Sequence, residues 1–220
     1  MNQDDPFQGR GNVAQAERPR TSPESLLTAD DLYLFNQGTH VQLYNKLGAH
    51  PRTLDGAPGV QFAVWAPNAK TVTVEAYGKG SYPLGPRADS GIWEGFVPEL
   101  AAGTIYKYRI VSRVNGYLIE KADPFAFYAE MPPKTASIVH SLDYDWQDRE
   151  WMTGRASRNS LAAPIAIYEM HAGSWRRRSD GGWLSYRELA APLVEHLTRT
   201  GFTHVEFLPL GEHPFYGSWG

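Results

Sequence analysis

Hydrophobic and polar residues alternate along several short stretches between residues 60 and 121. Val60, Phe62 and Val64 would share one face of a β-strand, because side chains along a strand point alternately to its two faces. The same kind of pattern predicts further strands over residues 71–74, 92–97, 104–112 and 117–121. Turn residues such as glycine, proline and asparagine separate these stretches. Short strands with regular turns between them predict a small β-sandwich.

A different pattern begins towards the end of the chain, where residues 165–170 and 202–210 are strand candidates. Between them, Ser185 and Glu188 have the spacing of a capping box, and hydrophobic residues follow at helical spacing. Pro192 interrupts this helix pattern, so we expect either a late helix start or a kink. A strand, a helix and a second strand in this order predict a βαβ unit with parallel strands.

These patterns divide the chain into four parts. We expect residues 1–30 to be a flexible N-terminal tail and residues 31–125 to form the β-sandwich, with residues 30–47 docking onto it as a short helix and extended chain. Residues 126–160 would be a connecting segment, and residues 161–220 would hold the βαβ unit. One such unit can neither close a barrel nor cover both faces of a parallel sheet. We therefore expect the chain to be the front part of a longer polypeptide.

The composition argues against several classes of function. The chain has 220 residues with 21 basic and 24 acidic side chains, so its net charge is −3 and no basic excess is present for binding nucleic acid. The absence of cysteine excludes disulfides and thiol chemistry. The longest apolar run, residues 161–168, is too short to span a membrane, and the N-terminus has no secretory signal. We therefore expect a cytoplasmic protein that binds neither nucleic acid nor membrane.

Aromatic residues make up 13% of the chain. This share suits a protein that handles flat, weakly polar ligands such as sugars, although an aromatic core would give the same value. The seven histidines show no spacing typical of metal ligands. We therefore predict no metal site and no cofactor.

Several segments resemble a known family. The segments are 47–50 (LGAH), 62–69 (FAVWAPNA), 121–126 (KADPFA), 168–177 (YEMHAGSWRR), 201–210 (GFTHVEFLPL) and 212–220 (EHPFYGSWG). The last three resemble the first two barrel strands, and the loop after them, of the glycogen branching enzymes, which belong to the α-amylase superfamily of (β/α)8 TIM barrels. The first three are similar to the immunoglobulin-like glycan-binding β-sandwich that precedes that barrel.

This resemblance implies an α-glucan partner, such as glycogen or amylose, and a retaining double displacement on its α-1,4 linkages. A glucan 6-hydroxyl would intercept the covalent glycosyl-enzyme and form an α-1,6 branch. In this superfamily the catalytic carboxyl groups come from later barrel strands, which this chain lacks. We therefore predict no catalytic residue here and expect the fragment alone to be inactive. Two alternatives stay open: a stand-alone glucan-binding module without catalysis, and the N-terminal part of a debranching hydrolase.

Five residues are candidates for glucan contact. His213 and Trp219 follow the second barrel strand, at the face where barrel active sites form, but either could pack within a loop. Lys107 and Tyr117 lie on strands or turns that line the glycan face in similar modules. A tyrosine ring offers a sugar an apolar platform and a lysine donates to hydroxyls, although both are ordinary residues on a β-sandwich surface. Trp93 could instead belong to the core.

Other conspicuous residues have plainer interpretations. Glu169 and Glu206 on adjacent parallel strands could approach the separation of a retaining pair, but we interpret them as polar residues of a barrel interior. The run Arg176–Arg178 suits a solvated loop better than a phosphate site. The loop at residues 77–82 is shorter than in many relatives and lacks their sugar-stacking tryptophan, which weakens the case for glucan binding. Trp65 is expected to be a core residue or an interdomain contact.

Overall fold

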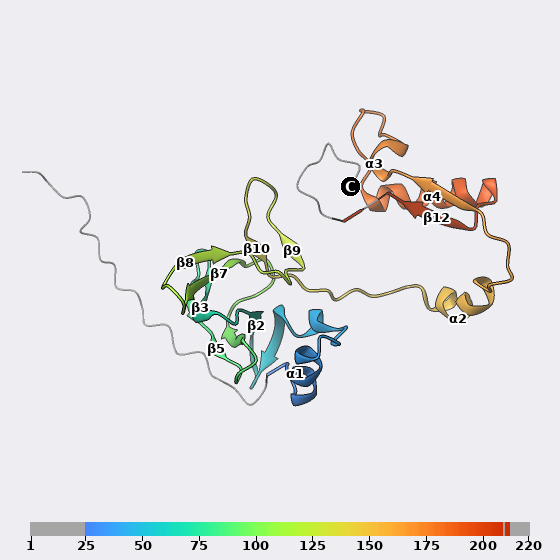
Figure 1. Ribbon diagram of the computed structural model, residues 1–220. Helices are drawn as coiled ribbons and strands as arrows, with labels where there is room; N and C mark the ends of the chain where they lie inside the picture. The colour runs from blue at the N-terminus through green and yellow to red at the C-terminus, as the bar shows by residue number, and fades with distance from the viewer. Residues whose placement is uncertain (1–24, 209, 212–220) are drawn as a thin grey trace, which may run out of the picture. The chain divides into compact units, whose positions relative to one another are not determined.

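The computed structural model describes residues 25–208, 210 and 211 (Figure 1). The chain separates into two compact units, the first ending at Asp143 and the second beginning at Tyr144. This boundary falls within residues 126–160, where the sequence predicts a connecting segment. Residues 1–24 of the predicted tail lie outside the described residues.

The first unit contains two antiparallel sheets. One sheet has the strand order β1-β2-β6-β5 and consists of β1 (Gly48–Leu54), β2 (Ala57–Trp65), β6 (Ile92–Pro98) and β5 (Gly85–Pro86). The other has the order β4-β3-β7-β10-β9, with β8 paired to β7. It consists of β4 (Gly80–Pro83), β3 (Ala69–Ala76), β7 (Ile105–Ser112), β10 (Ser137–Ile138), β9 (Tyr128–Ala129) and β8 (Leu118–Lys121). The predicted β-sandwich is confirmed.

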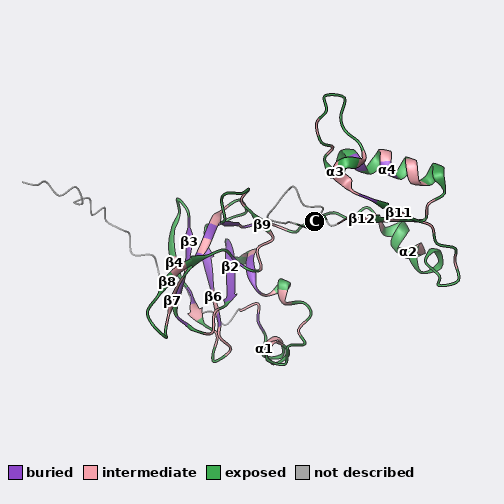
Figure 2. Ribbon diagram, turned by 45° about the horizontal axis from the view of Figure 1, so that its top comes forward, coloured by how far each residue is buried: buried purple, intermediate pink, exposed green. Residues whose placement is uncertain are grey.

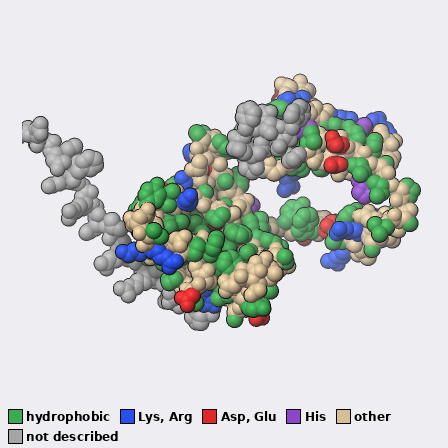
Figure 3. All heavy atoms as spheres, viewed as in Figure 1, with side chains coloured by type: hydrophobic (Ala, Val, Ile, Leu, Met, Phe, Trp, Pro, Cys, Tyr) green, Lys and Arg blue, Asp and Glu red, His purple; other side chains and the backbone are tan. Residues whose placement is uncertain are grey.

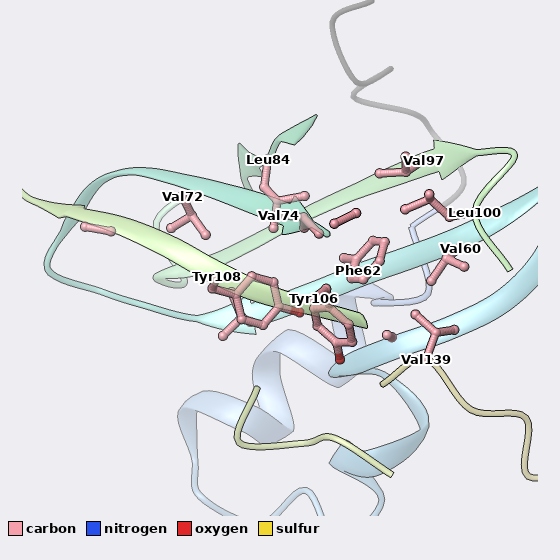
Figure 4. Close-up of a cluster of buried hydrophobic side chains, with 14 residues drawn as sticks. Val60, Phe62, Val72, Val74, Leu84, Val97, Leu100, Tyr106, Tyr108 and Val139 are labelled. Carbon is pink, nitrogen blue, oxygen red and sulfur yellow. The ribbon is translucent and has the colours of Figure 1, made fainter. Parts of the chain in front are cut away.

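The hydrophobic core of this unit lies between the two sheets, and buried residues concentrate in their strands (Figure 2). Val60, Phe62 and Val64 are all buried, so the alternation in the sequence identified the inward face of β2. Tyr106 and Tyr108 enter the same core from β7 (Figure 4). The rings of Phe62 and Tyr106 meet edge to face with centroids 5.1 Å apart, which joins the two sheets.

A buried carboxylate, that of Asp123, lies beside this core. Its Oδ2 accepts hydrogen bonds from the hydroxyls of Tyr106 at 2.7 Å and Tyr108 at 3.1 Å, and its Oδ1 accepts one from the backbone N–H of Phe125 at 2.8 Å. Its own backbone N–H donates to Ser137 Oγ. Burial raises the pKa of Asp123, and the hydrogen bonds partly oppose this rise. Asp123 therefore ties β7, β10 and the chain that leaves β8 into one network.

The N-terminal segment 25–47 covers the outer face of the β1-β2-β6-β5 sheet. It holds helix α1 (Ala29–Asn36) and the 3-10 helix η1 (Leu43–Asn45). Leu27 and Leu47 of this segment form a buried cluster with Ala63 and Ile92 of the sheet. The predicted docking of residues 30–47 is confirmed. The assignment of residues 25–30 to a flexible tail is wrong, because Leu27 is 1% exposed and its side chain closes this cluster.

Asp31 is the polar anchor of the same segment. Its carboxylate accepts hydrogen bonds from the Thr28 backbone N–H, at 2.8 Å, and from the Thr28 hydroxyl, and it lies 2.8 Å from His40 Nε2 and 2.9 Å from Lys46 Nζ. Burial alone would raise the pKa of Asp31, but the hydrogen bonds from Lys46, Thr28 and His40 outweigh it and hold the pKa well below its ordinary value of 3.8. One carboxylate therefore joins both ends of the segment.

The second unit contains a parallel pair of strands with a helix between them. Its elements are α2 (Arg149–Arg158), β11 (Ile167–Met170), α3 (Ala172–Trp175), α4 (Tyr186–Thr200) and β12 (His204–Phe207). Strands β11 and β12 pair in parallel register, and α4 packs on one face of them through Leu189 and Leu193, which contact Met170. The predicted parallel βαβ arrangement is confirmed. Among the described residues this sheet has two strands, so the structure does not show a barrel.

The ends of α4 agree with the sequence pattern. Ser185 Oγ accepts from the Glu188 backbone N–H and the Glu188 carboxylate accepts in return from the Ser185 backbone, while Gly201 ends the helix in the left-handed conformation with φ 80°. The helix starts at Tyr186, so of the two expected alternatives the late start after Pro192 is wrong, and the kink stays a prediction. The capping box satisfies the first N–H groups, which stabilises this early start despite the proline inside the helix.

We predict that Tyr106→Phe destabilises the first unit by about 1.5–3 kcal/mol, because the buried Asp123 carboxylate loses one of its donors. The matched control is Tyr82→Phe, since the Tyr82 hydroxyl donates to the Lys79 carbonyl at 3.2 Å in an exposed position. This control should cost at most about 0.5 kcal/mol. Denaturant unfolding measures both, and equal losses would contradict the role of Asp123.

We also predict that Asp31→Asn destabilises the docked N-terminal segment at neutral pH. The pKa of Asp31 is lowered by folding, so its stabilisation is fully present above the ordinary value of 3.8 and is lost as the pH falls below it. The difference in stability between the wild type and Asp31→Asn should therefore shrink as the pH drops below about 3.8. Hydrogen exchange of α1 as a function of pH measures this, with Asp30→Asn as a control. A difference that grows with acid would contradict the prediction.

Candidate functional site

The strongest candidate site is the outer face of the six-stranded sheet. Lys107 and Arg109 alternate along β7 with the buried Tyr106 and Tyr108, so their side chains point away from the core. Glu75 of β3 lies opposite Lys107 in the register and shares this outer face. The face therefore presents charged groups over two neighbouring strands.

The Glu75 carboxylate is already paired with neighbouring side chains on this face. The Ser81 hydroxyl donates to its Oε2, and Arg109 Nε lies 3.0 Å from its Oε1. The residue is buried although it is charged. A buried carboxylate that is paired in this way fixes the side chains around it and is a poor contact for an incoming ligand.

Tyr77 follows β3 on the same outer face and is 47% exposed. Burial raises the pKa of the Tyr77 hydroxyl, and the nearby carboxylates of Glu120, Glu130 and Glu75 raise it further. The hydroxyl is therefore a neutral donor among acidic groups. Tyr77 was not among the predicted contacts, although its place two residues after Glu75 put it on the same face of the strand pattern.

Lys107 and Tyr117 are not brought together. Lys107 Nζ donates to Thr135 Oγ1 at 2.8 Å, and its side chain lies on the outer face. Tyr117 is 61% exposed and lies opposite Ser112, whose N–H donates to its carbonyl at 2.8 Å. Ser112 is five residues beyond Lys107 on β7, a separation of about 17 Å, and the alternation turns it to the other face. The register places Tyr77, two residues after Glu75, diagonally from Lys107.

Trp93 has a defined structural environment. The Trp93 indole N–H donates to the Ala66 carbonyl at 3.1 Å, and its partly buried ring packs against the hydrophobic core. This geometry leaves it little freedom to contact a ligand. His213 and Trp219 lie outside the described residues.

In the second unit, Glu169 and Glu206 lie directly opposite each other across the parallel pair β11 and β12. Both are exposed, and both are on the face that α4 leaves uncovered, since Tyr168, Met170 and Val205 face the helix. Neighbouring strands are about 4.8 Å apart, so the two acidic residues are adjacent.

The arginine run in the same unit is engaged within the chain. The guanidinium groups of Arg176 and Arg177 lie over the Trp175 and Trp183 rings, at 4.3 and 3.1 Å from the ring centroids. Arg178 forms an ion pair with Glu188 at 2.9 Å. These contacts account for all three side chains without an anion.

Residues 25–208, 210 and 211 form neither a metal site nor a membrane-spanning helix. No group of three or more His, Asp or Glu side chains within these residues is placed to hold a metal ion. No helix formed by them is long and apolar enough to cross a membrane. In Figure 3 the Lys and Arg side chains lie at several separate places on the visible surface.

Comparison with known proteins gives the site a context. Residues 46–126 match the family model of Carbohydrate-binding module 48 (Isoamylase N-terminal domain). The chain is 55% identical over 195 residues to the 1,4-alpha-glucan branching enzyme GlgB of Albidiferax ferrireducens, and 50% identical over 203 residues to that of Aquifex aeolicus. These matches cover 86% and 89% of this chain but only 31% and 32% of the relatives, so the chain spans about a third of their length.

A solved structure agrees in fold. The crystal structure of a putative alpha amylase from Salmonella typhimurium superposes with a TM-score of 0.57 over 79% of this chain and 26% of that chain, at 23% identity. This likeness shows the fold alone. The sequence matches, for their part, confirm the predicted resemblance to branching enzymes.

Proposed function

We propose that this chain, a relative of the GlgB 1,4-alpha-glucan branching enzymes, is part of a cytoplasmic enzyme of glycogen synthesis that makes α-1,6 branches. The enzyme would move a segment of an α-1,4-glucan onto a glucan 6-hydroxyl. The observation that carries this proposal is the 55% identity over 195 residues, a length that exceeds either structural unit. A glycan-binding sandwich alone would fit a debranching enzyme equally well, but identity through both units favours branching.

Each of the two units would have its own role. The sandwich would bind α-glucan. It would occupy the predicted residues 31–125 together with residues 25–30 of the docked N-terminal segment. After a connecting segment at 126–160, residues 161–220 would begin a (β/α)8 barrel. The parallel pair β11 and β12, covered by α4 on one face only, supports this assignment, because a barrel leaves the other face for its interior.

Catalysis would depend on residues outside this chain. A retaining glycosyl transfer needs two carboxyl groups about 5–5.5 Å apart, one as nucleophile and one as acid and base. Glu169 and Glu206 are adjacent, but no hydrogen bond within the described residues holds either carboxylate in one position. We assign them no catalytic role. His213 and Trp219 would contact substrate at the carboxyl end of the second strand.

Glucan contact by the sandwich would use Tyr77 and Lys107. Lys107 lies opposite Glu75 in the register, so Tyr77, two residues after Glu75, is its diagonal neighbour. Diagonal residues in an antiparallel pair are about 7–8 Å apart, which lets one sugar reach both side chains. The exposed ring of Tyr77 offers an apolar platform, and Lys107 and Thr135 offer polar partners for hydroxyls.

We predict that the purified chain does not branch amylose, whereas a longer protein that includes it does. Iodine absorbance and the NMR signal of α-1,6 anomeric protons measure the products. Branching by the chain alone would contradict the assignment of catalysis to residues outside it. If the longer protein instead removes α-1,6 linkages from glycogen, this would favour a debranching enzyme.

We predict that Tyr77→Ala weakens retention of the chain in a native gel containing glycogen by about threefold to tenfold, because a stacked ring is lost. Lys107→Met should weaken it by a smaller factor. Tyr33→Ala, which removes an exposed tyrosine of α1, is the control and should leave retention unchanged. Unretarded migration of the wild type would show that the sandwich does not bind glucan.

A further inference from the structure

Trp65 is an exposed tryptophan that neither the core nor the Tyr77 face explains. It ends β2 and is 54% exposed, so of the two expected roles the core residue is wrong, and the interdomain contact stays a prediction. Ala63, two residues earlier on the same side of the strand, is buried under segment 25–47. Trp65 therefore lies on the outer face of the β1-β2-β6-β5 sheet, at the margin of its N-terminal cover.

The indole of Trp65 is held in place by two neighbours. Phe35 of α1 meets it edge to face, with ring centroids 6.1 Å apart. Gly91 lies beside the indole nitrogen, since an added Cβ there would be 3.0 Å from Trp65 Nε1 and 2.8 Å from Pro67 Cβ. Only glycine lets the indole lie so close to this turn, where the backbone has φ +76°. The ring is thus preorganised, and its N–H makes no hydrogen bond to another residue of the described chain.

We propose that Trp65 is a second contact for α-glucan, in which a glucose ring packs on the exposed part of the indole and the indole N–H donates to a sugar hydroxyl. The proposal rests on the proposed function. A rigid aromatic side chain with an unused donor suits a ligand that has an apolar face and a hydroxyl rim, which describes glucose. Trp65 also lies within residues 46–126, which match the carbohydrate-binding module.

The position of Trp65 makes this contact distinct from the Tyr77 face. Trp65 and Tyr77 lie on the outer faces of the two different sheets, with the hydrophobic core between them. A short linear oligosaccharide cannot stack on both at once. A branched polymer can reach both faces, so both weak contacts would contribute to the affinity for glycogen. Maltoheptaose would use only one contact at a time.

The first test follows the Trp65 indole N–H by NMR while maltoheptaose is added to the 220-residue chain. Trp65→Phe assigns the signal. The Trp65 signal should shift and saturate, also in Tyr77→Ala, while the signal of Trp93, which is bonded to Ala66, should stay unchanged. A Trp65 signal that does not move while glycogen retention still depends on Tyr77 would overturn this inference alone. If neither site responds to glucan, the proposed glucan binding fails with it.

The second test measures binding to glycogen and the solvent exposure of the Trp65 ring. Trp65→Ala should weaken retention by glycogen about threefold to tenfold, and Trp65→Phe should keep most of it. In a longer protein that includes this chain, hydroxyl radicals should oxidise Trp65 without glucan, and glycogen should protect it. Protection without glucan would mean that another part of that protein covers the ring, and this would overturn the inference.

Discussion

The buried carboxylate of Asp123 is the interaction on which the first unit depends. A charge in a core is costly unless it is fully hydrogen-bonded, and here the Tyr106 and Tyr108 hydroxyls and the Phe125 N–H surround it. Because both tyrosines must reach inward to Asp123, the residues between and beyond them on β7 must face outward. The same network holds Phe125, which packs against the cluster under segment 25–47.

These constraints place the two proposed glucan contacts. The inward tyrosines of β7 put Lys107 on the outer face, where Tyr77 is its diagonal neighbour. On the opposite sheet, segment 25–47 covers Ala63, and Phe35 of the same segment contacts Trp65. The Trp65 ring is therefore exposed but held by Phe35. In the second unit, helix α4 covers one face of β11 and β12, and Glu169 and Glu206 lie on the uncovered face.

Local sequence patterns predicted much of this fold, because they depend on neighbours along the chain. The alternation around Phe62 and the capping box at Ser185 are of this kind. The burial of Leu27 was missed, because it depends on contacts with Ala63 and Ile92 far along the sequence. The separation of Lys107 from Tyr117 was missed for a similar reason, since it depends on the register of the β7–β8 hairpin.

We propose that the first unit binds glucan and that the second unit forms part of a barrel. The most direct test compares the affinity for glycogen of residues 25–143, of residues 144–220 and of the whole chain, by ultracentrifugation with glycogen. We expect residues 25–143 to bind as tightly as the whole chain and residues 144–220 to show no binding. Binding by residues 144–220, with none by residues 25–143, would contradict the account.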